Sequence, residues 1–313
     1  MLQYLIILLD DTSVSFCHYR NTNSNRRLIA LDGLKAGILF AMKHNLMVQF
    51  VYPDYELPES YATVIESIDH HKIKPFSLKE DASVVVYDYR EAVSDQTLNR
   101  NEKTTLVLRI TKDELFSGYE EVIHFLKRSN RLSLVITDTD TFRKEDFDTY
   151  KKVLSHLESA IPEALKENDD MPQLNILSDR IQLEKMNNCN AGVENITLAP
   201  NGKFYVCPAF YIEDENDSAG NPAEGITISN RQLYTLAYAP VCRKCDAYHC
   251  KRCIWLNKKT TLEVNTPSHE QCVTAHLERN ASRNLLNELH AKGFFPNKEI
   301  REITCLDPFE WKE

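Results

Sequence analysis

This 313-residue chain lacks the long apolar runs that a membrane protein needs. No segment approaches the ~18 consecutive apolar residues that span a bilayer. The opening stretch, MLQYLIILLDD, holds an apolar run of only about nine residues, which ends at Asp10 and has no basic residue before it. A signal peptide needs such a basic segment, so we interpret the stretch as a buried strand. We therefore expect a cytoplasmic protein with no membrane partner.

The chain also has no excess of positive charge. Lys and Arg number 37 against 46 Asp and Glu, which gives a formal net charge of −9. Proteins that bind nucleic acid usually present a basic face to the phosphates. The basic residues here are interspersed with acidic ones, so we expect a solvated acidic surface and no nucleic-acid partner.

Cysteine is nearly absent from the first part of the chain and frequent in the last. Cys17 stands alone before Cys189, and the other eight cysteines lie between Cys189 and Cys305. The change follows residues 179–186, where we place a domain boundary. We predict a first domain at residues 1–180 and a second at 181–313, which contains a helix near Ala275–Leu289.

The first domain alternates strand-like and helix-like segments. The expected strands are Leu2–Leu9, Leu46–Val51, Ser83–Tyr87, Thr105–Ile110, Leu132–Thr137 and Leu174–Leu177. The expected helices are Leu31–His44, Ser60–His70, Asp113–Ser129 and Lys144–Leu165, and Thr111 fits the N-cap of the third. Several strands are continuous apolar runs, as in sheets covered on both faces. The alternation predicts an α/β fold with parallel strands, as an open sheet or part of a barrel.

The cysteines between Cys189 and Cys272 have a spacing that indicates metal binding. They follow the pattern Cys189-x12-Gly202-x4-Cys207, then Cys242-x2-Cys245-x4-Cys250-x2-Cys253, then Cys272. Disulfides are rare in a reducing cytosol, so clustered cysteines more often bind metal there. The two C-x2-C pairs are only four residues apart, whereas zinc sites usually separate such pairs by ~15–20 residues.

Bacterial ferredoxins offer a closer precedent, because three closely spaced cysteines there bind one [4Fe–4S] cluster. The same logic assigns Cys242, Cys245, Cys250 and the distant Cys272 to one cluster. Cys253 then belongs with Cys189 and Cys207. Zinc takes the same thiolate ligands and stays an alternative, with His249 or His269 close enough in sequence to complete a site.

This order of cysteines resembles the SPASM domain, the auxiliary-cluster domain of radical SAM enzymes that mature peptides. The resemblance covers about 84 residues and includes ITLAPNGKFYVCP (Ile196–Pro208), which is similar to the hairpin that delivers the second cysteine. Two gaps are one residue shorter than in the family. The resemblance implies two [4Fe–4S] clusters: a first on Cys189, Cys207 and Cys253, whose fourth ligand is open or not a cysteine, and a second on Cys242, Cys245, Cys250 and Cys272.

The first domain resembles the partial (β/α)6 barrel of radical SAM enzymes in the order of its segments, but without its catalytic motifs. The loop SVSFCHYRN carries only Cys17 where that family has C-x3-C-x2-C, and the eight glycines of the chain are never adjacent, so no Gly-Gly-Glu stretch occurs. The resemblance therefore implies a degenerate barrel that does not cleave S-adenosylmethionine.

This combination is similar to the CXXX-repeat peptide maturases, as is the stretch TTLEVNTPSHEQCVTAHLER (Thr260–Arg279). The likeness implies a partner or redox protein, not an independent catalyst. It would help to mature a cysteine-rich precursor peptide beside a radical SAM maturase. The alternative is a zinc-binding interaction module on the same cysteines.

Two other groups could suggest independent catalysis. They are the doublet His70-His71 and the acids Asp138 and Asp140, which follow a strand. We interpret both as ordinary structural residues, because adjacent side chains diverge and polar residues commonly follow strands. Cys305 lies beyond the SPASM-like region, and we expect it to be unligated.

Overall fold

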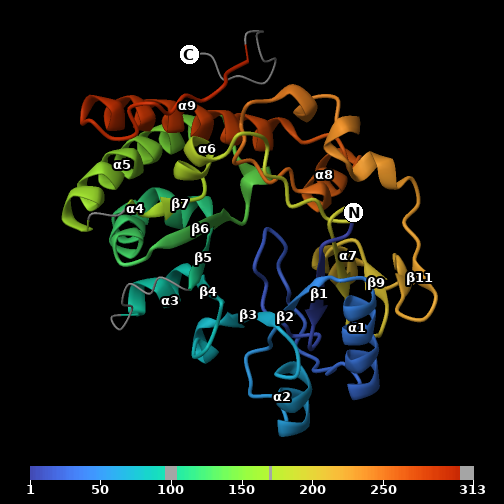
Figure 1. Ribbon diagram of the computed structural model, residues 1–313. Coiled ribbons are helices and arrows are strands. Elements are labelled where there is room, and N and C mark those ends of the chain that lie inside the picture. The colour runs from blue at the N-terminus through green and yellow to red at the C-terminus, as the bar shows by residue number, and fades with distance from the viewer. Residues whose placement is uncertain (96–103, 169–170, 304–313) are drawn as a thin grey trace. The chain divides into compact units, whose positions relative to one another are not determined.

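The computed structural model describes residues 1–95, 104–168 and 171–303. The chain is α/β with a mostly parallel arrangement of strands, which confirms the predicted fold class at this level. It divides into two compact units, and each unit combines two stretches of the chain (Figure 1). Unit 1 consists of residues 1–86 and 189–239, and unit 2 of residues 87–188 and 240–313. The division into residues 1–180 and 181–313 rests on the change in cysteine content along the sequence and stays a prediction.

Unit 1 is built on a parallel sheet in the order β4-β3-β2-β1-β8, with β9 antiparallel at its edge. The strands are β1 (Tyr4–Leu8), β2 (Met47–Val51), β3 (His70–Pro75), β4 (Val84–Asp88), β8 (Asn195–Leu198) and β9 (Phe204–Tyr205). The register places Tyr4 of β1 opposite Met47 of β2 on one side and Asn195 of β8 on the other. The first strand of the chain is therefore central in this sheet, which explains its continuous apolar sequence.

Helix α1 (Leu31–Lys43) packs against β1 and β2 of this sheet. Its buried Leu34 and Ile38 join a core formed by side chains from β1, β2 and β8. Gly37 lies at the closest approach, because a Cβ there would be 2.3 Å from Cδ2 of Leu198. The remaining elements of the unit are α2 (Glu59–Ile65), α7 (Pro208–Glu213) and a small hairpin of β10 (Gly220–Asn221) and β11 (Gly225–Ile226).

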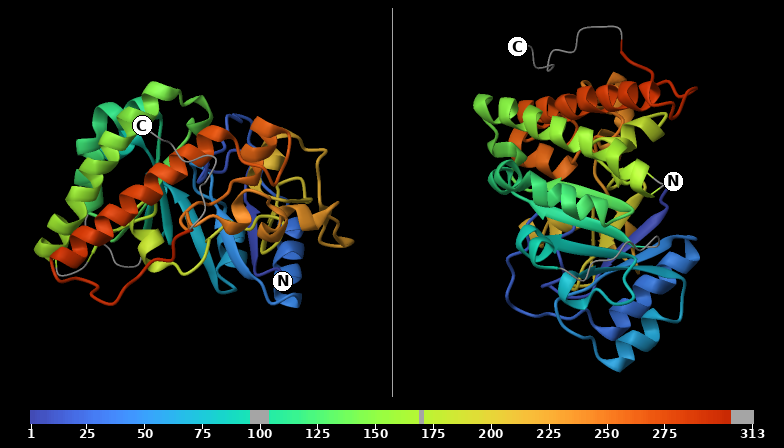
Figure 2. Two further views of the ribbon diagram at one scale, coloured as in Figure 1. Left: turned by 90° about the horizontal axis from the view of Figure 1, so that it is seen from above. Right: turned by 90° about the vertical axis from the view of Figure 1, so that its left-hand side faces the viewer.

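Unit 2 combines three parallel strands with a layer of long helices (Figure 2). The strands are β5 (Thr105–Ile110), β6 (Arg131–Ile136) and β7 (Gln173–Leu174). The helices are α3 (Tyr89–Ser94), α4 (Lys112–Lys127), α5 (Lys144–Asn168), α6 (Ser178–Gln182), α8 (Ile254–Thr261) and α9 (His269–Ala291). Helix α5 packs against both α4 and α9. The predicted cap of α4 is confirmed, since the Thr111 side chain accepts a hydrogen bond from the Glu114 amide at 3.3 Å.

The six predicted strands are all present within a few residues of their expected bounds, but β3 was missed. The predicted helix Ser60–His70 is wrong in its second half, because α2 ends at Ile65 and His70 begins β3. The β3 sequence, HHKIKP, has a single buried residue, Ile73. It forms a strand because β2 and β4 offer it hydrogen bonds on both sides, which is tertiary context that sequence propensity does not carry.

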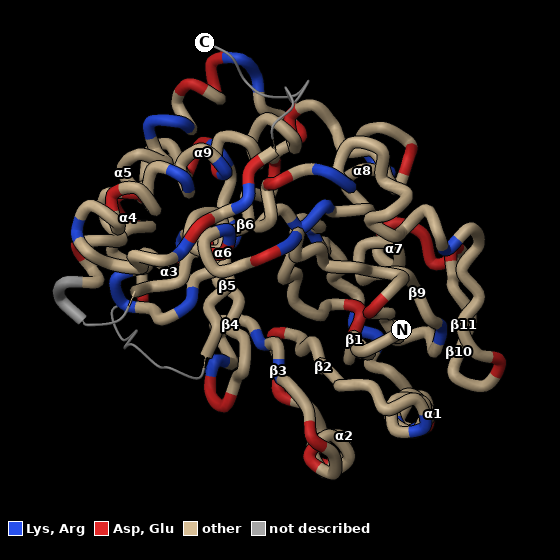
Figure 3. Tube along the Cα trace, turned by 45° about the horizontal axis from the view of Figure 1, so that its top comes forward, with Lys and Arg blue, Asp and Glu red and all other residues tan. Residues whose placement is uncertain are grey.

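Acidic and basic residues are interspersed along the trace of both units (Figure 3), consistent with the mixed charge pattern of the sequence. Within the described ranges, no helix combines the length and the apolar character required to cross a membrane.

Candidate functional site

Four of the predicted cluster cysteines lie around one pocket in unit 2. Cys242, Cys245, Cys250 and Cys272 line it together with small or apolar side chains, and with Arg252, Gln271 and His276. The pocket encloses about 30 Å³, which is room for about two water-sized spheres. The structure therefore brings together the complete set predicted for the second cluster.

The loop that carries three of these cysteines turns tightly on its own backbone. The short 3-10 helix Cys242–Lys244 ends where the amide of Cys245 donates to the Cys242 carbonyl at 3.0 Å. The amide of Ala247 donates to Sγ of Cys245 at 3.4 Å. An N–H group directed at a thiol sulfur is the local arrangement expected of a metal-binding C-x2-C turn.

The fourth cysteine is placed by the start of α9. Ser268 caps this helix, and it forms a capping box with Gln271, whose Oε1 accepts the Ser268 amide at 2.9 Å. Cys272 follows directly, in the first turn and a half of the helix. The N-terminus of a helix stabilises negative charge, so it favours thiolate at this position.

The surroundings of Cys250 favour its neutral thiol until a cation binds. Burial raises the pKa of Cys250 well above the usual range, the backbone N–H of Arg252 lowers it in part, and the thiols of Cys242 and Cys245 raise it further. No Asp or Glu is among the described residues that line the pocket. Metal binding to these sulfurs would therefore release protons and depend on pH.

Buried ion pairs of Asp246 with two arginines hold the cysteine loop in place. The Asp246 carboxylate is 2% exposed, and it lies 3.2 Å from Nη1 of Arg279 and 3.2 Å from Nη2 of Arg180. Nε of Arg180 also donates to the Asp246 carbonyl at 3.0 Å. Because Asp246 directly follows Cys245, these bonds fix the backbone between two of the pocket thiols.

A second buried anchor holds the same loop at His249. Nε2 of His249 lies 2.9 Å from Oε2 of Glu278 on α9, and the Tyr150 hydroxyl donates to Oε1 of Glu278 at 2.7 Å. His249 is thus tied to a carboxylate and does not line the pocket. His269 also stays outside the pocket, since its ring packs on Phe147. Sequence analysis missed both anchors, because residues that lie 29 to 128 positions apart form them.

The set predicted for the first cluster is divided between the two units. Cys189 and Cys207 belong to unit 1, and Cys253 belongs to unit 2 directly before α8. Cys207 is the N-cap residue of α7 and follows the β8–β9 hairpin. The resemblance led us to expect this hairpin with Asn201-Gly202 in its turn, and the antiparallel pairing of the two strands is present. Gly202 adopts a φ of +77° there, as such turns require. Cys305 lies outside the described residues.

The pocket thiols are not gathered around one point. Among residues 1–95, 104–168 and 171–303, no group of three or more His, Cys, Asp or Glu side chains could hold a single metal ion. Zn–S bonds of ~2.3 Å place tetrahedral thiolates only ~3.8 Å apart. An iron–sulfur cluster inserts its own iron and sulfide between its ligands and so holds them farther apart. The donor set fits a thiolate-bound cluster, and the side chains around the small cavity would have to move outward to admit one.

The loop after β1, in unit 1, is closed by its own polar contacts. Nε of Arg27 lies 2.8 Å from Oδ2 of Asp11, whose other oxygen accepts the Tyr211 hydroxyl. Asp10 is fully buried, and it accepts the Tyr55 hydroxyl at 2.9 Å. These two acids follow a central parallel strand, where α/β proteins place their sites, but here they serve to hold the loop.

The residues considered for independent catalysis have structural partners. Nδ1 of His70 lies 2.8 Å from the Ile68 carbonyl, and its ring packs edge-on against Phe50. Asp138 accepts the amide of Lys112 at the start of α4, and Asp140 pairs with Lys259 at 2.9 Å. Our interpretation of these residues as structural agrees with these contacts.

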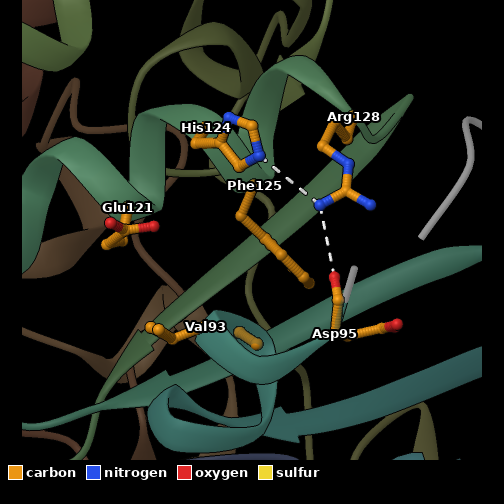
Figure 4. Close-up of a pocket in the computed structure, with 7 residues that line it drawn as sticks. Val93, Asp95, Glu121, His124, Phe125 and Arg128 are labelled. Atoms are coloured by element: carbon orange, nitrogen blue, oxygen red, sulfur yellow. Dashed lines mark hydrogen bonds between the residues drawn. The ribbon is translucent and has the colours of Figure 1, made fainter. Parts of the chain in front are cut away.

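A second, larger pocket lies between α3 and α4 of unit 2 (Figure 4). It has a volume of about 500 Å³ and is lined mainly by Val93, Asp95, Glu121, His124, Phe125 and Arg128. Nη1 of Arg128 donates to the Asp95 carbonyl at 3.2 Å and lies 3.5 Å from Nε2 of His124. Arg128 therefore links the end of α4 to the residue that follows α3 at one side of this pocket.

Neither the models of known protein families nor the sequences of curated proteins match this chain.

Proposed function

We propose that this protein binds iron–sulfur clusters and assists the maturation of a ribosomally made, cysteine-rich peptide of the CXXX-repeat type. The main observation in support is that four cysteines separated by up to 30 positions line one pocket: Cys242, Cys245, Cys250 and Cys272. The pocket has four sulfur donors and no carboxylate among its described lining residues, and such a donor set is typical of sites for soft metals and iron–sulfur clusters. A bound cluster would supply one-electron transfer to the peptide or to its maturase.

We infer that residues 1–180 are a degenerate radical-SAM-like barrel and residues 181–313 a SPASM-like domain. Parallel strands with intervening helices support the first part of this inference, and the cysteine order with its hairpin supports the second. The loop after β1 carries Cys17 as its one cysteine, and its acids are engaged by Arg27, Tyr55 and Tyr211. This loop would therefore not hold a cluster that cleaves S-adenosylmethionine.

The first test is the iron, sulfide and zinc content of the protein after anaerobic purification. Two [4Fe–4S] clusters would give about eight iron and eight sulfide per chain with broad visible absorption. About two zinc ions and no sulfide would instead favour the second candidate, a structural interaction module. The small volume of the pocket, about 30 Å³, favours a single ion over a four-iron cluster, and the thiols would have to close around that ion. A protein with neither metal would contradict both.

The second test separates the two predicted clusters. Cys245→Ser removes one ligand of the second set and should reduce the bound iron by about half. Cys17→Ser is the matched control, because Cys17 lies in unit 1 outside both sets, and it should leave the iron unchanged. Iron unchanged in the Cys245 variant would refute the assignment of two clusters.

The third test concerns the barrel. Dithionite and S-adenosylmethionine together should produce no 5′-deoxyadenosine, because the loop carries one cysteine where three are needed. Stoichiometric 5′-deoxyadenosine would show that the protein is itself a radical SAM enzyme. The same assay repeated on Cys17→Ser would then tell whether this residue is a ligand.

A further inference from the structure

His276 enters the cysteine pocket from the same helix as Cys272. The two residues are four positions apart on α9, so their side chains lie on one face of the helix. His276 is 2% exposed and lines the pocket, with Nε2 at 3.7 Å from Sγ of Cys245. This distance is within hydrogen-bonding range for a sulfur acceptor.

The two buried carboxylates on the cysteine loop and on α9 have partners of their own. Asp246 pairs with Arg180 and Arg279, and Glu278 contacts Tyr150 and His249.

Within the pocket itself, Oε1 of Gln271 already accepts the amide of Ser268 at 2.9 Å. Sγ of Cys245 accepts the Ala247 amide at 3.4 Å, so a second donor at Nε2 of His276 would give this sulfur two hydrogen bonds. Two N–H donors would stabilise negative charge on this sulfur.

We propose that His276 is a positioning residue that donates a hydrogen bond to the Cys245 thiolate and thereby raises the reduction potential of the second cluster. The inference rests on the proposed function, because it assumes a cluster on Cys242, Cys245, Cys250 and Cys272. Reduction adds one electron and no proton, and the added negative charge spreads onto the sulfur ligands. Hydrogen bonds to those sulfurs stabilise that charge and raise the potential.

The test compares two variants of His276 with a control on the same helix. His276→Phe removes the N–H donor and keeps an aromatic ring, whereas His276→Gln keeps an N–H donor. His290→Gln is the control, because His290 is exposed at the end of α9. The first measurement is the iron and sulfide content per chain. The second is the fraction of reduced cluster, which electron paramagnetic resonance reports during a redox titration with dithionite.

We expect His276→Phe to retain iron and to lower the ratio of reduced to oxidised second cluster about tenfold at a fixed potential, which is ~59 mV for one electron. His276→Gln should recover part of this ratio, and His290→Gln should match the wild type. Equal ratios in His276→Phe and the wild type would overturn the inference. So would the loss of about four iron from His276→Phe with an unchanged circular dichroism spectrum, since His276 would then be a ligand. A wild-type protein without iron would instead refute the proposed function, and the inference with it.

Discussion

The buried carboxylate of Asp246 should contribute more to the stability of unit 2 than any surface ion pair does. Asp246→Asn keeps the shape of the side chain but leaves Arg180 and Arg279 facing a neutral amide. Removal of one partner of a buried ion pair costs ~3–5 kcal/mol. Arg180 keeps its 3.0 Å bond to the backbone carbonyl, so we expect the lower end, about 3 kcal/mol.

The suitable assay is urea unfolding of the metal-free protein. Tryptophan fluorescence can report it, because Trp255 lies on α8 of this unit. With a slope of ~2 kcal/mol per molar urea, the loss corresponds to a midpoint lower by about 1.5 M. Asp140→Asn is the matched control, because Asp140 pairs with the half-exposed Lys259, and such pairs contribute less than ~1 kcal/mol. Equal midpoints for the two variants would refute the reasoning.

Two further predictions concern stability. Burial raises the pKa of Glu158 from 4.5 to about 7, so the folded state binds the proton more tightly, and stability falls as the pH rises from about 4.5 through 7. The full shift would be worth at most ~3.4 kcal/mol, and solvent screening at this half-buried position reduces it to about 1 kcal/mol. Glu158→Gln should therefore flatten the dependence of thermal stability on pH between 5 and 8, and an unchanged slope would contradict this. Gly202→Ala should cost about 1 kcal/mol because of its φ of +77°, whereas Gly33→Ala in α1 should be neutral or stabilising; calorimetry that shows equal effects would refute the distinction.

The sequence predicted most strands of this protein because apolar runs such as Leu5–Leu9 and Val85–Tyr87 are buried and carry their own signal. The four cysteines that the sequence pattern assigned to the second cluster line one pocket, three of them from one tight loop and Cys272 from α9. The sequence did not predict β3, where a single apolar residue, Ile73, occupies a strand that its neighbours stabilise. Nor did it reveal the pairing of Arg180 with Asp246, since a charged residue is ordinarily expected on the surface and only the fold brings these two together.

His276 shows what information was missing at the site itself. The sequence places it four residues after Cys272, a spacing that puts both on one face of a helix. The helix predicted from the sequence begins only at Ala275, which leaves Cys272 outside it, so the spacing alone did not indicate that Cys272 and His276 share a helix face. The observed helix begins at His269 under the Ser268 cap. A search for the Ser-x-x-Gln capping signal would have found it.

The division of each unit into two stretches of chain has a consequence for how the protein is made. Strand β1 is synthesised well before its partner β8, which begins only at Asn195. One edge of β1 therefore stays unpaired until the chain up to β8 has left the ribosome. Arg180 is likewise synthesised before its partner Asp246, and Tyr150 before its partner Glu278. A fragment that ends at residue 180 would leave both units incomplete and prone to aggregate, so the four pocket cysteines can come together only after the chain through the start of α9 has emerged.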